Sequence, residues 1–105
     1  MRRGEIWWAE LSRPIGSRPV VLLSREPAYS VREFVTISTV STRVRGIPAE
    51  LPLGPEDGLT RRSVVNLDVV YTIPKAALRR RIGVPSPEKI ARIDQAIHFA
   101  LGLND

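Results

Sequence analysis

Hydrophobic and polar residues alternate along most of this chain, and the alternation predicts β-strands. Runs rich in Val, Ile, Thr and aromatic residues are typical of strands, and five such runs occur, at residues 5–11, 19–24, 31–42, 49–53 and 63–72. Pro48 and Pro52 mark the fourth run as short or at a sheet edge. Residues 54–58, Gly-Pro-Glu-Asp-Gly, are a turn by composition. Further on, residues 75–80 are expected to form one or two helical turns, and residues 81–84 a last short strand.

The C-terminal segment predicts one long helix. Ser86 suits the N-cap, Pro87 the first helical position, Glu88 the positive end of the helix dipole, and Gly102 the stop. The apolar residues of this segment recur at helical spacing and are expected on one buried face: Ile90, Ile93, Ile97 and Leu101.

This order of elements favours a β-rich α+β fold, a small antiparallel barrel that is closed or flanked by the C-terminal helix. A parallel doubly wound sheet would need a helix between successive strands. At 105 residues, the chain is expected to be a single domain, residues 1–105, with a modest core and no separate cofactor-binding half. No internal repeat or linker divides it.

The charge of the chain predicts a polyanionic partner. Sixteen Lys and Arg residues against eleven Asp and Glu residues give a net charge of +5, and fourteen of the sixteen cations are arginine. Arginine favours bidentate binding of phosphate. A GC-rich genome gives the same arginine bias for reasons unrelated to function.

Most familiar enzyme chemistries lack their residues here. The chain has no cysteine and a single histidine, His98, which is interpreted as a packing or surface residue, so neither a metal nor a cofactor is expected. There is no glycine-rich phosphate loop and no nucleophile elbow. No signal peptide and no apolar run of about 18 residues is visible, which predicts a soluble, cytoplasmic protein without a membrane partner.

RNA cleavage remains open to such a chain, because RNA carries its own nucleophile. The ribose 2′-hydroxyl can attack the adjacent phosphorus, so the protein needs only to align the groups, move protons and stabilise charge. Arg18 stands before Pro19 at the start of the second strand, a position that suits it to grip a phosphate. Arginine is a poor general base, so its role is charge stabilisation, with proton donation to the leaving oxygen also open, and the identity of the general base stays open.

Four stretches of the chain form an ordered set of motifs. They are residues 3–7 (Arg-Gly-Glu-Ile-Trp), residues 16–21 (Gly-Ser-Arg-Pro-Val-Val), Ser38-Thr39 inside a hydrophobic strand, and residues 63–68 (Ser-Val-Val-Asn-Leu-Asp). Together with the C-terminal helix, they resemble the MazF/PemK family of toxin endoribonucleases over practically the whole chain.

This resemblance implies a small SH3-like barrel of the CcdB/PemK type that forms a homodimer. It also implies the toxin of a type II toxin–antitoxin system, which cuts single-stranded RNA without metal and leaves a cyclic phosphate and a 5′-hydroxyl. The usual partner is a cognate antitoxin whose C-terminal tail occupies the RNA groove. Carried over by motif, the catalytic arginine falls on Arg18 and the catalytic threonine on Thr39.

Residues around these two are predicted to contact RNA: Gly16, Ser17, Ser38, Ser41, Arg43 and Asp68. Gly16 and Ser17 offer backbone donors to a phosphate, although such a pair is more often simply a turn. Arg43, with Arg45, is placed to follow the RNA backbone, unless both are merely solvated. Asp68 either reads a base, orients Arg18, or forms a structural ion pair.

Trp7 and Trp8 are adjacent on a predicted strand, so their rings point to opposite faces. One is expected in the core, and the other is a candidate for stacking on a base or for covering a dimer contact.

The chain departs from the family pattern in two places. Only six residues separate Leu11 from Arg18, where relatives have a longer loop over the active site. After Asp68, the usual polar residues are replaced by Val69, Tyr71 and Pro74. Two other functions therefore stay open: a CcdB-like toxin that binds DNA gyrase without nuclease activity, and an inactive module that binds RNA or antitoxin. RNA cleavage needs Arg18 paired with Thr39, and gyrase binding does not.

Overall fold

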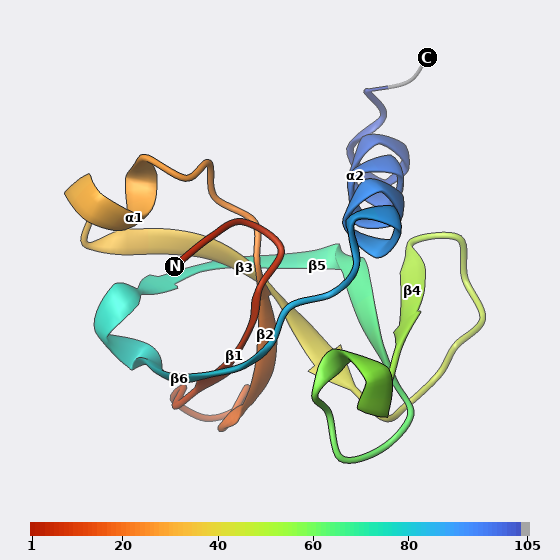
Figure 1. The fold of residues 1–105 in the computed structure, drawn as a ribbon, viewed down its shortest axis with the longest axis horizontal. Coiled ribbons are helices and arrows are strands. Elements are labelled where there is room, and N and C mark those ends of the chain that lie inside the picture. The colour runs from red at the N-terminus through yellow and green to blue at the C-terminus, as the bar shows by residue number, and fades with distance from the viewer. Residues whose placement is uncertain (104–105) are drawn as a thin grey trace.

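The computed structural model describes residues 1–103 of the chain as an antiparallel sheet with two α-helices and two 3-10 turns (Figure 1). The strands are β1 (Ile6–Ala9), β2 (Arg18–Leu22), β3 (Phe34–Ser41), β4 (Glu50–Leu53), β5 (Ser63–Pro74) and β6 (Leu78–Gly83). The helical elements are α1 (Ala28–Val31), η1 (Pro55–Asp57), η2 (Lys75–Ala77) and α2 (Pro87–Leu101). Within residues 1–103, no helix combines the length and apolar character needed to cross a membrane.

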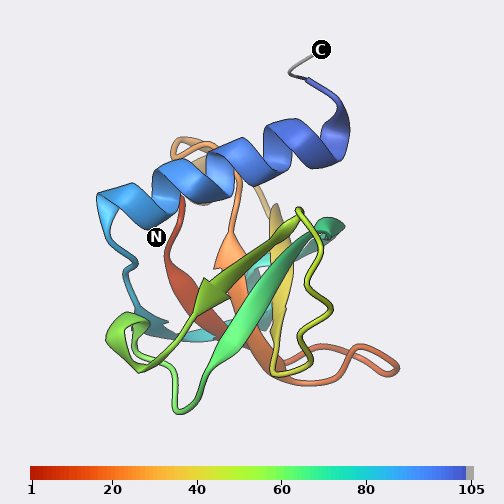
Figure 2. The ribbon, with the colours of Figure 1, turned by 90° about the vertical axis from the view of Figure 1, so that its right-hand side faces the viewer.

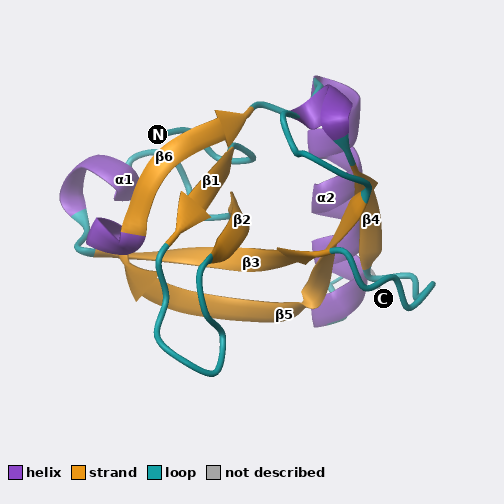
Figure 3. Cartoon of the chain, turned by 90° about the horizontal axis from the view of Figure 1, so that it is seen from below, coloured by secondary structure: helices purple, strands orange, loops and turns teal. Residues whose placement is uncertain are grey.

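The sheet has six strands in the order β4-β5-β3-β2-β1-β6, and every neighbouring pair is antiparallel. Figure 3 shows how strongly it curves, with β6 and β1 on one side and β3 and β5 along the other. The strands β4 and β6 form the two edges, so the barrel is open between them. The predicted fold class, a small antiparallel barrel with a C-terminal helix, is confirmed.

The turn that follows β4 and η1 packs closely against the backbone of β6. A Cβ atom added to Gly58 would overlap the carbonyl oxygen of Ile82 in β6, and one added to Gly83 would overlap that of Asp57. Gly58 has a φ of +94°, a conformation that favours glycine. The turn after η1 therefore closes on β6 only because neither glycine has a side chain.

Ion pairs attach this closing turn to α2. Lys89 Nζ lies 2.6 Å from the buried carboxylate of Asp57 and 2.9 Å from that of Glu56. Arg62 donates two hydrogen bonds, of 2.8 and 2.9 Å, to Glu56. Hydrogen bonds lower the pKa of Glu56 to about 2, with the larger effect from Arg62 and the smaller from Lys89. The network thus joins the turn, the start of β5 and the first turn of α2.

The curved sheet buries residues on both of its faces, in two clusters. One cluster lies beneath α2 and β4 and contains Val21 and Ile93, and the other lies toward α1 and η2 and contains Val20 and Tyr29. Figure 1 shows α1 and α2 at opposite ends of the molecule. Successive residues of β2 therefore point alternately into the two clusters, as strand geometry requires.

Both predicted ends of α2 are confirmed, but its predicted buried face is confirmed only in part. Ser86 Oγ accepts a hydrogen bond from the Lys89 amide at 3.2 Å, and Gly102 adopts a φ of +70°. α2 lies across one end of the sheet (Figure 2). Ile93 and Ala96 are buried, whereas Leu101 is 62 % exposed. The buried face is centred on Ile93, Ala96 and Ala100, which leaves Leu101 at its margin.

Two boundaries predicted from the sequence were wrong. The third strand begins at Phe34 rather than at residue 31, because residues 28–31 form the helix α1. Helical structure after Pro74 is limited to η2, and β6 already begins at Leu78. Pairing with β1 places residues 79–81 in a strand, although three consecutive arginines show no apolar alternation.

β5 has a bulge opposite residues 38–40 of β3. Ser38 pairs with Val70 and Val40 pairs with Val65, so β5 carries more residues than β3 between these two pairs. The fully buried Ser38 hydroxyl lies 2.6 Å from the carbonyl oxygen of Asn66 and 2.7 Å from that of Val69. Ser38 thereby holds the bulged backbone against β3.

We predict that Gly58→Ala destabilises the protein more than Gly16→Ala. Both positions have positive φ, which costs a residue with a side chain about 1–2 kcal/mol. Gly16 has open space around it, whereas alanine at position 58 must also displace the β6 backbone, at a further ~1–3 kcal/mol. Urea unfolding of the two variants measures the difference, and equal losses would contradict the closure described above.

Ser38→Ala is expected to lower the free energy of unfolding by about 1–3 kcal/mol, because it leaves buried carbonyl oxygens without their donor. The exposed Ser17→Ala is the matched control and should change stability little. Chemical denaturation gives both values. Unchanged stability in Ser38→Ala would show that the hydroxyl does not hold the bulge.

Candidate functional site

A groove of about 300 Å³ opens beside the start of β2 and the end of β3. We call it the Arg18 groove. Its walls come from β2, β3, β5, the 43–46 loop and the start of β4, and its lining residues are Arg18, Thr39, Ser41, Arg43, Arg45, Glu50, Val64, Asn66, Val69 and Tyr71.

The pairing of β2 with β3 brings Arg18 and Thr39 into this one groove. Val20 lies directly opposite Thr39. Arg18 is two residues before Val20 and therefore points to the same face. Diagonal neighbours of this kind are roughly 7–8 Å apart, within reach of a long side chain. The two predicted catalytic residues therefore line the same groove.

Arg18 has a donor that the protein itself does not satisfy. Its Nε atom is buried, and it has no hydrogen-bond partner among residues 1–103. The ion pairs formed within the described chain do not include Arg18. An unsatisfied buried donor costs about 1–3 kcal/mol. The guanidinium is consequently available to an anion that enters the groove.

Two aliphatic hydroxyl groups line the same groove as Arg18. Thr39 is only 9 % exposed and presents its side chain to the groove. Ser41, two residues further along β3, accepts a hydrogen bond of 3.0 Å from the Arg43 amide. The Ser41 proton remains available for donation, because accepting a bond does not use it.

The loop that carries Arg43 and Arg45 is held by Glu50. One carboxylate oxygen of Glu50 accepts hydrogen bonds from the amides of Arg45, at 3.0 Å, and Gly46, at 2.8 Å. The other oxygen accepts from Arg45 at 3.1 Å. These bonds fix the loop beside the groove, with both arginines in its wall. Glu50 is also the one carboxylate among the lining residues.

Three lining residues of the groove were not predicted from the sequence as site residues: Glu50, Asn66 and Tyr71. Alternation in β4 buries Leu51 and Leu53 and thus turns Glu50 away from the core, but only the tertiary structure places it beside Arg18. Val69 and Tyr71 replace polar residues of the family pattern, and both line the groove, whereas Pro74 does not. No residue of the short 12–17 loop lines it either.

Gly16, Ser17 and Asp68 lie outside the groove. The amide of Gly16 donates to the Ser12 carbonyl at 3.1 Å, so its predicted role as a phosphate donor is replaced by a turn. Ser17 is exposed next to Arg18. Asp68 is exposed in the β5 bulge, and it forms no ion pair within residues 1–103, with Arg18 or any other cation.

The structure contradicts the prediction for Ser38. Its side chain is 0 % exposed, and its hydroxyl bonds to backbone carbonyls of β5. Ser38 points away from Thr39 because neighbouring strand residues face opposite sides of the sheet. Its role is structural, and the proposed RNA contacts exclude it.

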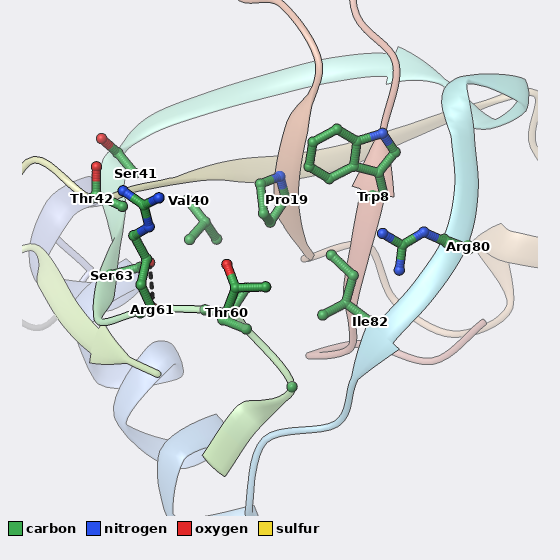
Figure 4. A pocket seen from close by; sticks show the side chains of 12 residues that line it. Trp8, Pro19, Val40, Ser41, Thr42, Thr60, Arg61, Ser63, Arg80 and Ile82 are labelled. Carbon is green, nitrogen blue, oxygen red and sulfur yellow. Dashed lines mark hydrogen bonds between the residues drawn. The ribbon is translucent and has the colours of Figure 1, made fainter. Parts of the chain in front are cut away.

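A second opening of about 250 Å³ lies on the other side of the same strand ends (Figure 4). We call it the Trp8 pocket. It is lined by Trp8, Pro19, Val40, Ser41, Thr42, Gly58, Leu59, Thr60, Arg61, Ser63, Arg80 and Ile82. Trp7 points the opposite way, packs against the cluster near α1, and donates a hydrogen bond of 3.0 Å to Glu5. The two indoles thus lie on opposite faces, as expected from the sequence.

Residues 1–103 contain no group of three or more His, Cys, Asp or Glu side chains placed to hold a metal ion. His98 is exposed near the end of α2, away from both openings.

Comparison with known proteins gives a consistent result. Residues 2–101 match the family model for PemK-like, MazF-like toxins of type II toxin–antitoxin systems. Two Mycobacterium tuberculosis proteins described as probable endoribonucleases, MazF5 and MazF2, are each 38 % identical to the chain. The alignment with MazF5 covers 94 % of this chain and 91 % of that protein, and the alignment with MazF2 covers 97 % and 99 %.

Solved structures agree with the sequence matches. The Mycobacterium tuberculosis toxin MazF-mt6 superposes with a TM-score of 0.88 at 34 % identity, covering 96 % of this chain and 99 % of that one. A mycobacterial endoribonuclease in complex with its cognate antitoxin gives a TM-score of 0.88 at 28 % identity, covering 100 % and 98 %. The chain therefore belongs to the PemK/MazF family of toxins of type II toxin–antitoxin systems.

Proposed function

We propose that this protein is an endoribonuclease toxin that cleaves single-stranded RNA in the Arg18 groove, without a metal ion. The observation that carries the proposal is the buried, unpaired Nε of Arg18 in the same groove as the Thr39 hydroxyl. Membership of the toxin family and relatives described as endoribonucleases support it.

The proposed reaction uses the substrate's own nucleophile. The 2′-oxygen forms a bond to the adjacent phosphorus while the bond from phosphorus to the 5′-oxygen breaks, which gives a 2′,3′-cyclic phosphate and a 5′-hydroxyl. Negative charge grows on the non-bridging oxygens in the transition state. Arg18 stabilises that charge, and the Thr39 hydroxyl donates a hydrogen bond to it. The groove thus supplies charge stabilisation and alignment.

Two protons must move in this reaction, one from the 2′-hydroxyl and one to the leaving 5′-oxygen. Glu50 is the carboxylate that lines the groove, but its oxygens already accept three backbone hydrogen bonds. These three bonds use most of the acceptor capacity of the carboxylate and direct it toward the loop backbone. We therefore assign Glu50 to positioning the 43–46 loop rather than to proton transfer.

Binding of the RNA strand is assigned to the edges of the groove. Ser41 and Arg43 lie in its wall, with Arg45 beside them, and suit the phosphates next to the cleaved one. Ser17 and Asp68 are exposed and remain proposed contacts for nucleotides outside the groove.

The proposed setting is the cytoplasm, where RNA and an antitoxin are both accessible. A relative was solved with its cognate antitoxin, which supports a similar partner for this chain. We propose that the antitoxin covers the Arg18 groove and that the toxin acts as a homodimer.

Arg18→Ala should reduce cleavage by about 10³–10⁵-fold, as is typical when an arginine that stabilises phosphoryl charge is removed. The fold should keep its stability or gain a little, because the substitution removes an unsatisfied buried donor. The assay follows a fluorogenic RNA in EDTA beside a denaturant titration, with the exposed Arg25→Ala as control. A wild-type rate in Arg18→Ala would refute the assignment. No cleavage by the wild type itself would favour the gyrase-binding or inactive alternatives.

Thr39→Ala should cost roughly 10²–10³-fold in kcat, the usual effect of losing one hydrogen-bond donor to a transition state. Thr39→Ser keeps the hydroxyl and should recover most of that rate. Thr36→Ala, on the same strand but outside the groove, is the control. Single-turnover cleavage measures all three, and equal rates for Thr39→Ala and the wild type would move the donor role to Ser41.

A further inference from the structure

We infer that the Trp8 pocket binds a nucleobase of the same RNA strand whose phosphate occupies the Arg18 groove. This inference rests on the proposed function and adds a base-binding site to it. It is carried by the strand register around Trp8, by the charges in the pocket, and by the ridge that the two openings share.

The sheet register builds a stacking surface. Trp8 in β1 pairs with Pro19 in β2 on one side and with Arg80 in β6 on the other. Cross-strand partners point to the same face, so the indole lies between the Pro19 ring and the Arg80 guanidinium. Arg80 Cζ lies 6.0 Å from the centroid of the Trp8 ring. Figure 4 shows all three side chains around the opening.

The arginines near this pocket fall into two groups, those that pair with a carboxylate and those that do not. In β6, Arg79 pairs with Glu10 at 3.2 Å and Arg81 pairs with Glu5 at 3.3 Å, whereas Arg80 has no carboxylate partner within residues 1–103. Strand alternation sends Arg80 to the face opposite its neighbours. The middle arginine of the run is thus the one that turns into the pocket.

The same division occurs before β5. Arg62 is bound by Glu56, while Arg61 has no ion pair in the described part of the chain and lines the pocket. The pocket lining contains two arginines and no carboxylate. It therefore favours a ligand that is anionic or rich in hydrogen-bond acceptors.

The remaining walls suit an aromatic ring with polar edges. Val40, Leu59 and Ile82 supply apolar surface. Thr42 and Thr60 add hydroxyl groups at the sides. Unstacked RNA bases are bound by aromatic rings and guanidinium planes on their faces and by hydrogen bonds on their edges. The pocket combines all three types of contact.

The two openings share one ridge. Ser41 lines both of them, and the adjacent residues Arg18 and Pro19 line the groove and the pocket respectively. Successive strand residues face opposite sides, so the start of β2 separates the two sites by the thickness of one strand. An RNA strand that crosses this ridge places a phosphate against Arg18 and a neighbouring base against Trp8.

The test uses a single-stranded 2′-O-methyl RNA that carries the sequence at which the wild type cuts, and anisotropy to measure its binding. Trp8→Leu should weaken binding roughly 5- to 100-fold, the range expected for one lost base–aromatic stack, and Arg80→Gln should weaken it severalfold by removing the guanidinium contact. On cleavable RNA, KM should rise by a similar factor while kcat changes little. Trp8→Phe keeps an aromatic face and should bind within a few-fold of the wild type.

A matched control separates base binding from general charge. Arg79→Gln removes the same charge from the same strand, but outside the pocket, and should bind RNA nearly as the wild type does. Equal losses in Arg79→Gln and Arg80→Gln would overturn the inference in favour of nonspecific attraction.

Abasic substitution in the probe identifies the bound base. Removing one base next to the uncut linkage should weaken binding to the wild type but not to Trp8→Leu, because that variant has already lost the stack. If the wild type cleaves RNA but no abasic position weakens binding in this way, the proposed base site is overturned while the proposed nuclease function stands. Absence of wild-type cleavage would count against the proposed function instead, and the anisotropy measurement would then use a mixed-sequence 2′-O-methyl RNA.

A second copy of this chain, or a protein partner, is the competing occupant. Sedimentation of the wild type and Trp8→Leu should give the same oligomeric state if a base fills the pocket. A change of oligomeric state in Trp8→Leu, with RNA affinity unchanged in its dissociated form, would overturn the inference and assign the pocket to a subunit contact.

Discussion

The register between β2 and β3 is the constraint on which the proposed chemistry depends. With Val20 opposite Thr39, Arg18 and Thr39 share a face. If either strand slipped by one residue, all of its side chains would change to the opposite face of the sheet, and Arg18 and Thr39 would no longer share a face. Residues of β2 fill both hydrophobic clusters, Val21 one and Val20 the other, so a slip would disturb the packing on both faces of the sheet. A functional geometry is thus held by ordinary packing.

Because the sheet packs on both faces, polar chemistry is confined to the ends of its strands. The start of β2 and the end of β3 meet at one such end, where both the Arg18 groove and the Trp8 pocket open. Within residues 1–103, four arginines outside the openings are tied to the fold by ion pairs, for example Arg3, whose guanidinium lies 2.5 Å from Asp94. Arg18, Arg61 and Arg80, which line the two openings, have no carboxylate partner within residues 1–103 and are left available to a ligand.

Much of this arrangement was accessible from the sequence. Apolar alternation identified most of the strands, and local cap chemistry identified both ends of α2 from Ser86 and Gly102. Sequence motifs singled out Arg18 and Thr39. Each of these signals is local, or is carried by residues that follow one another in a strand.

The features that the sequence did not reveal depend on contacts between distant segments. Ser38 looked like a neighbour of the site, but the β5 bulge encloses its hydroxyl. Glu50 reaches the groove only because β4 pairs with the start of β5. Arg80 is one of three consecutive arginines, and only pairing with β1 distinguishes it from the other two. Tertiary pairing decided each of these roles.

A structure of the protein with an RNA whose cleavage is blocked by a 2′-O-methyl group at the cut site would show whether Arg18 and Thr39 hold the scissile phosphate. The scissile phosphate should lie in the Arg18 groove, with one non-bridging oxygen bonded to the Arg18 guanidinium and to the Thr39 hydroxyl. A scissile phosphate bound elsewhere, with Arg18 and Thr39 untouched, would contradict this assignment.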